Sequence, residues 1–214
     1  MSALASSVNS FFQQVAADLS PLSVDPPPPP SVFPFEFVIS KAAVERKLMQ
    51  IKIHKAPGPD NLPNWVLRDF CMQLSGPVCA IFNASIREGF VPARWKEANV
   101  IPVPKVQPPK SVESDLRPIS LTATLGKLLE SFVGGWILGR IVDKLDDHQY
   151  GGLKRRSTTH ALVDMLHHWH SAADRGQSAR VVFIDFAKAF DHVDHNILVA
   201  KLLAYDLPDV IIRW

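Results

Sequence analysis

Residues 181–191 read VVFIDFAKAFD, an apolar run that ends in an aspartate. The apolar run from Arg180 to Phe186 predicts a strand that is buried on both faces of a sheet. Such a strand would carry Asp185 at its carboxyl end, facing a cleft. A carboxylate held there is suited to Mg²⁺, which prefers oxygen ligands and keeps water and substrate phosphates in its shell. The plain structural alternative is that Asp185 only caps the helix that follows.

The residues after this aspartate are small or aromatic. Ala187 and Ala189 permit close approach of the backbone, so that its amides could donate hydrogen bonds to a bound phosphate chain. Phe190 stands five residues beyond Asp185, where a flat ring could form one wall of a sugar pocket. An ordinary core aromatic is the alternative for Phe190, and the residues alone leave both open.

Most of the remaining chain shows the apolar periodicity of helices. A serine at position 40 and another at position 157 are expected to cap helices, and Asp194 to cap a third. The pair Gly76-Pro77 is expected to separate two helices. Residues 158–173 are expected to bury Leu162, Met165, Leu166 and Trp169. The helices predicted in this way span residues 1–20, 62–74, 78–86, 124–145, 158–173 and 194–203. One more is predicted to begin just after Ser40. A short strand is predicted at residues 99–103, at the edge of a sheet because it contains proline.

Two proline-rich segments interrupt the pattern. Pro26 to Pro30 form an unbroken run, which favours an extended polyproline spacer. We therefore predict that residues 1–39 are a disordered or linker segment. A docking site for a proline-binding module is the less favoured alternative. The segment KAPGPD, residues 55–60, predicts a rigid, turned loop.

Composition limits the class of protein. The chain has 214 residues, of which 47% are hydrophobic and 21% are charged, and its formal net charge is only +2. These values suit a globular protein with a sizeable core, and the charge alone does not indicate a nucleic-acid partner. No basic start precedes an apolar stretch at the N-terminus, and no window reaches the roughly 18 apolar residues that cross a bilayer. Two cysteines make no disulfide framework, so we expect an intracellular protein that is not secreted and has no transmembrane segment.

Several blocks of the chain, in order, resemble one known family. The first is FIDFAKAFDHVDHNILVAKL at 183–202, which resembles the first catalytic motif of reverse transcriptases from non-LTR retrotransposons. The other blocks are KAPGPDNLPNWVL at 55–67, FVPARWKEANVIPVPK at 90–105, LRPISLTATLGKLLES at 116–131 and HQYGGLKRRSTTHALVDML at 148–166. Blocks that agree in both order and spacing are more specific than any single short motif.

The resemblance implies a fold and a division of the chain. It implies an α+β protein in which a mostly helical fingers region, residues 40–160, is followed by the first strand and helix of a polymerase palm, residues 161–214. The palm would be truncated before the rest of its sheet. The later palm motifs of the family, which carry paired aspartates, are not found in this sequence, since Asp146-Asp147 lies before the palm begins.

The resemblance also implies roles for individual residues. Asp185 matches the first catalytic metal-binding aspartate of the family. The backbone carbonyl of Phe186 matches the carbonyl that binds the metal beside that aspartate. Phe190, with Ala189 beside it, matches the gate that excludes a ribose 2′-hydroxyl from the dNTP site. Lys105 and Arg117 match cations that grip the incoming triphosphate.

A basic cluster, Lys154, Arg155 and Arg156, could meet a nucleic-acid backbone, and a solvated basic turn is its alternative. One departure from the family lies in the same block, where Gly152 and Leu153 replace the usual aromatic and basic residues.

The activity implied is RNA-directed DNA synthesis with Mg²⁺ or Mn²⁺. The implied partners are an RNA template, a DNA primer, dNTPs and a downstream polypeptide with the remaining palm and thumb; no membrane is implied. A degenerate or co-opted nucleic-acid-binding remnant without catalysis is the alternative. A phosphatase with an aspartate nucleophile is disfavoured, because Ala187 stands where a second acid is usual. His167 and His170 share a helix face, but no third metal ligand stands at a familiar spacing.

Overall fold

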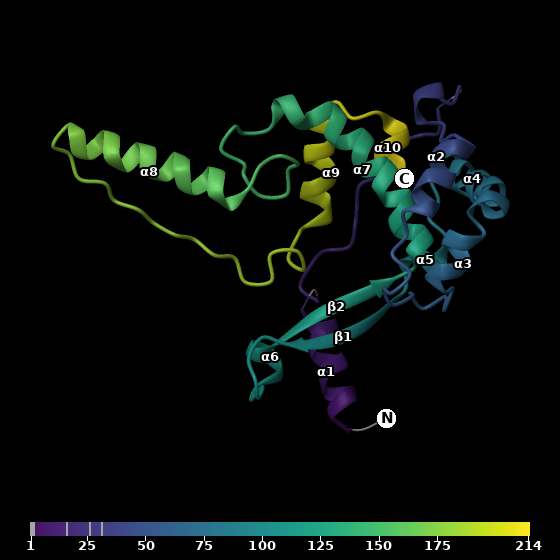
Figure 1. The fold of residues 1–214 in the computed structure, drawn as a ribbon, viewed down its shortest axis with the longest axis horizontal. Helices are drawn as coiled ribbons and strands as arrows, with labels where there is room; N and C mark the ends of the chain where they lie inside the picture. The colour runs from purple at the N-terminus through teal and green to yellow at the C-terminus, as the bar shows by residue number, and fades with distance from the viewer. Residues whose placement is uncertain (1–2, 16, 26, 31) are drawn as a thin grey trace. The chain divides into compact units, whose positions relative to one another are not determined.

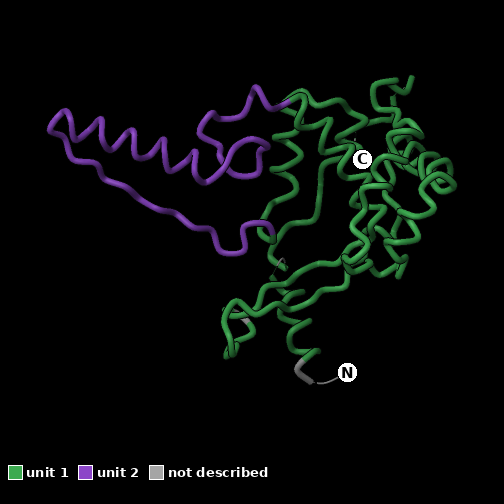
Figure 2. The backbone as a smooth tube through the Cα atoms, viewed as in Figure 1, with its two compact units in different colours: residues 1–140, 191–214 green, residues 141–190 purple. Residues whose placement is uncertain are grey.

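The computed structural model describes residues 3–15, 17–25, 27–30 and 32–214, which form two compact units (Figures 1 and 2). Unit 1 comprises residues 1–140 and 191–214, and unit 2 comprises residues 141–190. Helices dominate both, and a small antiparallel sheet lies in unit 1, so the predicted α+β class is confirmed.

The elements of unit 1 are mostly short helices. They are α1 (Ala3–Gln14), η1 (Phe35–Phe37), α2 (Lys41–Met49), α3 (Asn64–Asp69), α4 (Cys71–Glu88), α5 (Ala93–Lys96), β1 (Ala98–Pro104), α6 (Val112–Asp115), β2 (Leu116–Thr122), α7 (Thr124–Ile141), α9 (His195–Ala204) and α10 (Asp209–Arg213). Unit 2 contains η2 (Val142–Lys144) and α8 (Thr158–Asp174).

The core of unit 1 lies between α2, α4, α7 and α10. Val44, Leu48, Phe82 and Leu129 are fully buried there, and Ile211 joins them from α10. Burial of each such side chain stabilises the fold by about 1.5–3 kcal/mol, which makes this cluster the main source of order in the unit.

Three predicted helix caps are confirmed. The Ser40 hydroxyl accepts a hydrogen bond from the backbone N–H of Ala43, at 3.2 Å, and so begins α2. Asp194 accepts from the N–H groups of residues 196 and 197 at the start of α9, and Ser157 accepts from that of residue 160 at the start of α8. Caps can be predicted from sequence because each one involves only neighbouring residues.

The predicted helix break at Gly76-Pro77 is wrong. Helix α4 runs through both residues, and the interruption falls instead at Phe70, between α3 and α4. A glycine and a proline inside a helix together cost about 4 kcal/mol. The same helix buries a long face that includes Val78, Phe82 and Ile86, and burial of these three side chains more than offsets that cost.

The sheet is a two-stranded antiparallel pair. Ala98 of β1 lies opposite Thr122 of β2, and the register continues to Pro104 opposite Leu116. The predicted strand at 99–103 is therefore confirmed. Its prolines are tolerated because neither strand has a second neighbour that would need their missing N–H donors.

The burial predicted for the apolar side chains of α8 is not found. No residue of α8 is buried, and Leu162 and Leu166 are 54% and 46% exposed, while Met165 and Trp169 are partly exposed. A helix buries its apolar stripe only against a second packed element. Within unit 2, α8 is the one long helix of the described residues, so the stripe stays open.

The buried strand predicted from Arg180 to Phe186 is also not formed. Residues 177–186 have no regular secondary structure, and Val182, Phe183 and Ile184 are 77–81% exposed. Figure 2 shows this stretch as a long extended part of unit 2. A strand is stable only where neighbouring strands satisfy its backbone groups and cover its side chains, and the described part of unit 2 contains no strand.

Cys71 and Cys79 are both free, and the thiol of Cys79 donates a hydrogen bond to the carbonyl of Ile39 at 3.2 Å. None of the described helices has the length and apolar character needed to cross a membrane.

The N-terminal region carries local order on both sides of the proline run. The predicted helix near the start is present as α1, and Pro26 lies outside the described residues. Phe37 and Ile39 belong to the core cluster of unit 1, and the carbonyl of Pro27 accepts a hydrogen bond from Arg213. The division into segments 1–39, 40–160 and 161–214 stays a prediction.

Candidate functional site

Asp185 lies in an extended segment that ends in a turn at residues 187–192. Its side chain is exposed, as are those of Phe186 and Phe190, which are 76% and 95% exposed. Among the described residues, no group of three or more metal-ligating side chains includes Asp185. Among the described residues, Asp185 therefore stands apart from any pair of further His, Cys, Asp or Glu ligands.

Lys105 and Arg117 lie at the same end of the β1–β2 pair. Arg117 stands opposite Val103, and Lys105 follows β1 directly. The Lys105 ammonium donates to the carbonyl of Ser114 at 2.7 Å, and its backbone N–H donates to that of Asp115, also at 2.7 Å. The hairpin thus places the two predicted phosphate-binding cations at one end of the β1–β2 pair.

Asp115 organises the loop between those two strands. Its carboxylate accepts hydrogen bonds from the backbone N–H groups of Lys110 and Ser111 and from the Ser114 hydroxyl. These bonds, the one from Lys110 first, hold the pKa of Asp115 below its usual value, and the charge of Lys105 acts in the same direction. Asp115 is therefore a carboxylate at neutral pH and keeps the loop closed.

The basic cluster 154–156 divides into two kinds of residue. Arg156 is only 29% exposed, and its Nη1 donates to the carbonyls of Asp146, Asp147 and Gln149. It therefore holds the turn that precedes α8. Lys154 and Arg155 are exposed, and Arg155 has a positive φ of 66°.

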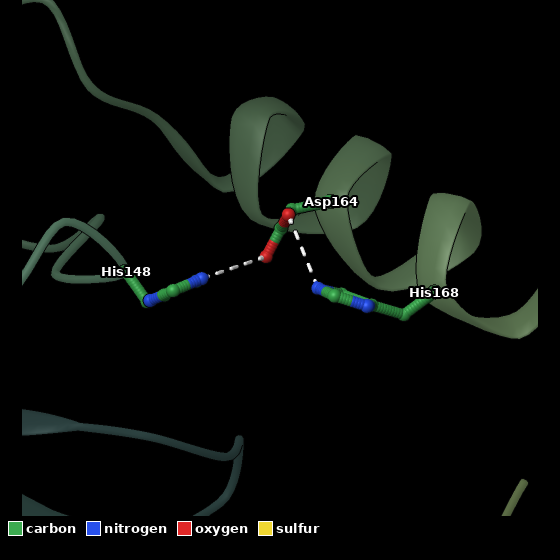
Figure 3. Close-up of side chains that lie close together, drawn as sticks. All are labelled: His148, Asp164 and His168. Atoms are coloured by element: carbon green, nitrogen blue, oxygen red, sulfur yellow. Dashed lines mark ion pairs between the residues drawn. The ribbon is translucent and has the colours of Figure 1, made fainter.

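The same turn and helix α8 bring together three side chains that sequence reasoning missed. His148, Asp164 and His168 each offer one ligand atom, and these atoms all lie within 4.8 Å of one another (Figure 3). Asp164 and His168 are four residues apart on α8, a spacing that could have drawn attention to them. His167 and His170, the pair considered from sequence, belong to no such group among the described residues.

The loop at residues 55–60 is fixed to the end of β2. Asn64 is 4% exposed, and its side-chain amide donates to the carbonyl of Lys55 at 2.8 Å and accepts from the Thr124 hydroxyl at 2.7 Å. Gly58 lies directly against the backbone of Thr122 and Ala123. The glycine belongs to the turned loop predicted at 55–60, but its contact with Thr122 and Ala123, and the role of Asn64, escaped sequence reasoning because these partners are distant along the chain.

Residues 103–214 match the family described as reverse transcriptase (RNA-dependent DNA polymerase). The chain belongs to the reverse transcriptase family. The match spans about half of the chain and contains every site residue that was predicted from the sequence: Lys105, Arg117, Lys154, Arg155, Arg156, Asp185, Phe186, Ala189 and Phe190.

Curated relatives of this chain come from mobile elements of fruit flies. A probable RNA-directed DNA polymerase from transposon BS of Drosophila melanogaster is 31% identical over 157 residues, which cover 72% of this chain and 17% of the relative. The RNA-directed DNA polymerase from mobile element jockey of the same species is 28% identical over 176 residues, covering 78% of this chain and 19% of the relative. The predicted kinship with non-LTR retrotransposon reverse transcriptases is confirmed, and the chain spans less than a fifth of the length of these relatives.

Proposed function

We propose that this chain is the fingers region and the beginning of the palm of an RNA-directed DNA polymerase from a retrotransposon. The observation that carries the proposal is the position of Asp185, within the block that resembles the first catalytic motif and inside the matched range 103–214. The names of the relatives support the same activity. The parent protein would add deoxynucleotides to the 3′-hydroxyl of a DNA primer on an RNA template.

In that parent protein Asp185 would supply one metal ligand through its carboxylate, and Phe186 a second through its carbonyl. Mg²⁺, or Mn²⁺ in its place, would neutralise charge that develops on the transferred phosphate. The other carboxylates would come from parts of the protein that this chain does not contain. The small span of the chain relative to its relatives supports that division.

Lys105 and Arg117 would bind the triphosphate of the incoming nucleotide. The hairpin supports this role, since it places both cations at one end and ties Lys105 to a loop that Asp115 keeps closed. A cation with a fixed position loses little entropy when phosphate binds. Ala189 and Phe190 would line the sugar side of the same nucleotide.

Lys154 and Arg155 would contact the backbone of the template. Both are exposed, and the turn that carries them is held by Arg156. An intracellular location, nuclear or cytoplasmic, is part of this proposal and agrees with the two free cysteines.

Primer extension on an RNA template tests the proposal. The full-length parent protein with Mg²⁺ is expected to synthesise DNA that depends on the template, and the 214-residue chain alone is expected to be inactive because it offers a single catalytic carboxylate. Failure of the full-length protein to extend any primer would contradict the polymerase assignment. It would favour the second candidate, a nucleic-acid-binding remnant, if the exposed cations Lys154 and Arg155 still gave salt-sensitive RNA binding.

Phe190→Val is expected to relax the choice of sugar. If the ring excludes a 2′-hydroxyl, its loss should raise ribonucleotide use relative to deoxyribonucleotide use by about 10- to 200-fold, the range that steric changes in a pocket produce. The measurement is single-nucleotide incorporation by the full-length protein with each sugar. Phe183→Val, a change in an exposed aromatic that has no proposed role in the site, serves as the control and should leave the ratio unchanged. If Phe190→Val and the unsubstituted protein showed the same ratio of ribonucleotide to deoxyribonucleotide use, Phe190 would have no place in the nucleotide site.

A further inference from the structure

His148, Asp164 and His168 form a compact cluster within unit 2. The Nε2 atom of His148 lies 3.9 Å from one carboxylate oxygen of Asp164, and the Nε2 atom of His168 lies 3.7 Å from the other. Figure 3 shows the two rings on either side of the carboxylate, one from the turn before α8 and one from α8 itself. Ligands on a tetrahedral ion with bonds of about 2.1 Å lie roughly 3.4 Å apart, so small side-chain rotations suffice to enclose an ion.

A neighbouring carboxylate already holds the His148 side chain in orientation. Asp146 accepts hydrogen bonds from the backbone N–H of His148, at 2.8 Å, and from its ring, 3.2 Å from Nδ1. A neutral imidazole that donates to Asp146 through Nδ1 keeps Nε2 as its acceptor atom, and Nε2 is the atom that lies toward Asp164. A carboxylate behind a histidine in this way is the usual companion of a metal-bound imidazole.

Asp164 lies near the phenol of Tyr150. Burial first, and then interaction with the Asp164 carboxylate, raise the pKa of Tyr150. Asp164 is also the least exposed of the three, at 32%, whereas the histidines are 65% and 67% exposed. The cluster therefore combines a partly buried carboxylate with two imidazoles that an ion can reach from solvent.

We propose that His148, Asp164 and His168 bind one divalent transition-metal ion of the Zn²⁺ class. Two imidazoles and one carboxylate are ligands that Zn²⁺, Co²⁺ and Ni²⁺ accept, whereas Mg²⁺ and Ca²⁺ prefer oxygen alone. Three protein ligands leave a coordination position for water. Bound metal would fasten the turn at 146–156 to α8 and so fix the basic residues Lys154 and Arg155 that the turn carries.

Binding of Co²⁺ and Zn²⁺ to the 214-residue chain tests the proposal. Co²⁺ gives visible absorption bands when imidazole and carboxylate bind it, and equilibrium dialysis with Zn²⁺ gives the number of ions per chain. We expect one ion per chain. His148→Ala, Asp164→Asn and His168→Ala should each weaken binding by at least about tenfold, since even residues that only orient a metal ligand change affinity by 10- to 100-fold.

The double substitution His167→Ala, His170→Ala is the matched control. It removes two imidazoles from the same helix outside the cluster, and it should leave the Co²⁺ spectrum and the stoichiometry unchanged. Circular dichroism of each variant checks that α8 is retained. Two results would overturn the proposal: no ion bound by the folded chain at millimolar Zn²⁺, or binding that survives His148→Ala and is lost in the double variant.

Discussion

Asp185→Asn in the proposed full-length polymerase is expected to lower the rate of nucleotide incorporation by about a thousandfold or more. Asparagine has nearly the same shape but lacks the negative charge that holds a divalent ion. Charge stabilisation by a metal contributes several kcal/mol to the transition state, and each 1.36 kcal/mol is worth a factor of ten. Primer extension under single-turnover conditions, with Mg²⁺ and then with Mn²⁺, measures the loss.

The structure makes this variant informative. Asp185 is exposed and lies in a segment without regular secondary structure, so its replacement removes no packing from the described fold. Asp191→Asn is a matched control, since Asp191 is a second exposed acid six residues further on. A large loss in the first variant with near-parent rates in the second would assign the effect to the metal ligand. Near-parent rates in both would leave Asp185 without a catalytic role.

Sequence reasoning succeeded where the structure depends on neighbours in the chain. Ser40, Ser157 and Asp194 were predicted as caps, and each accepts the expected backbone N–H. The strand at 99–103 was predicted from its composition in the same way. The caps need only a few consecutive residues to form, and the partner of the strand at 99–103, β2, is the next strand along the chain.

Sequence reasoning failed where the outcome depends on tertiary partners. The break at Gly76-Pro77 was predicted from intrinsic preference, and the buried face of α4 overrides that preference. The strand at 180–186 was predicted from its apolar run, and this chain gives it no neighbouring strand among the described residues. An apolar run indicates that a segment needs burial, but it does not provide the partner that buries it.

The candidate sites show the same contrast. Asp185 could be identified from the sequence, because its motif is contiguous. The cluster of His148, Asp164 and His168 could not, since His148 comes from a turn that Arg156 shapes by donating to three carbonyls. Only the spacing of Asp164 and His168 on one helix was visible beforehand, and a pair at that spacing is common on helix surfaces.

Gly58→Ala is expected to destabilise unit 1 by about 3 kcal/mol or more. A methyl group at this position would stand 2.5 Å from the nitrogen and 2.6 Å from the α-carbon of Ala123, and 2.6 Å from the carbonyl carbon of Thr122. All three are backbone atoms at the junction of β2 and α7, so no side chain can rotate away. Either the loop at 55–60 must lift or the junction must move, and lifting the loop would strain the buried hydrogen bonds of Asn64 to Lys55 and Thr124.

Gly76→Ala is the matched control for this substitution. Gly76 lies inside α4, and an added methyl group would meet nothing within 4 Å. Alanine is preferred over glycine in a helix by about 1 kcal/mol, so this variant should be more stable than the parent. Urea unfolding, monitored by circular dichroism, measures both changes. The midpoint urea concentration should fall for Gly58→Ala and rise for Gly76→Ala. Arg117, the proposed triphosphate ligand, lies on β2, which ends at that junction. Gly58→Ala in the proposed full-length polymerase should therefore also weaken triphosphate binding. Equal stability of Gly58→Ala and the parent would show that the loop at 55–60 does not pack against β2 and α7.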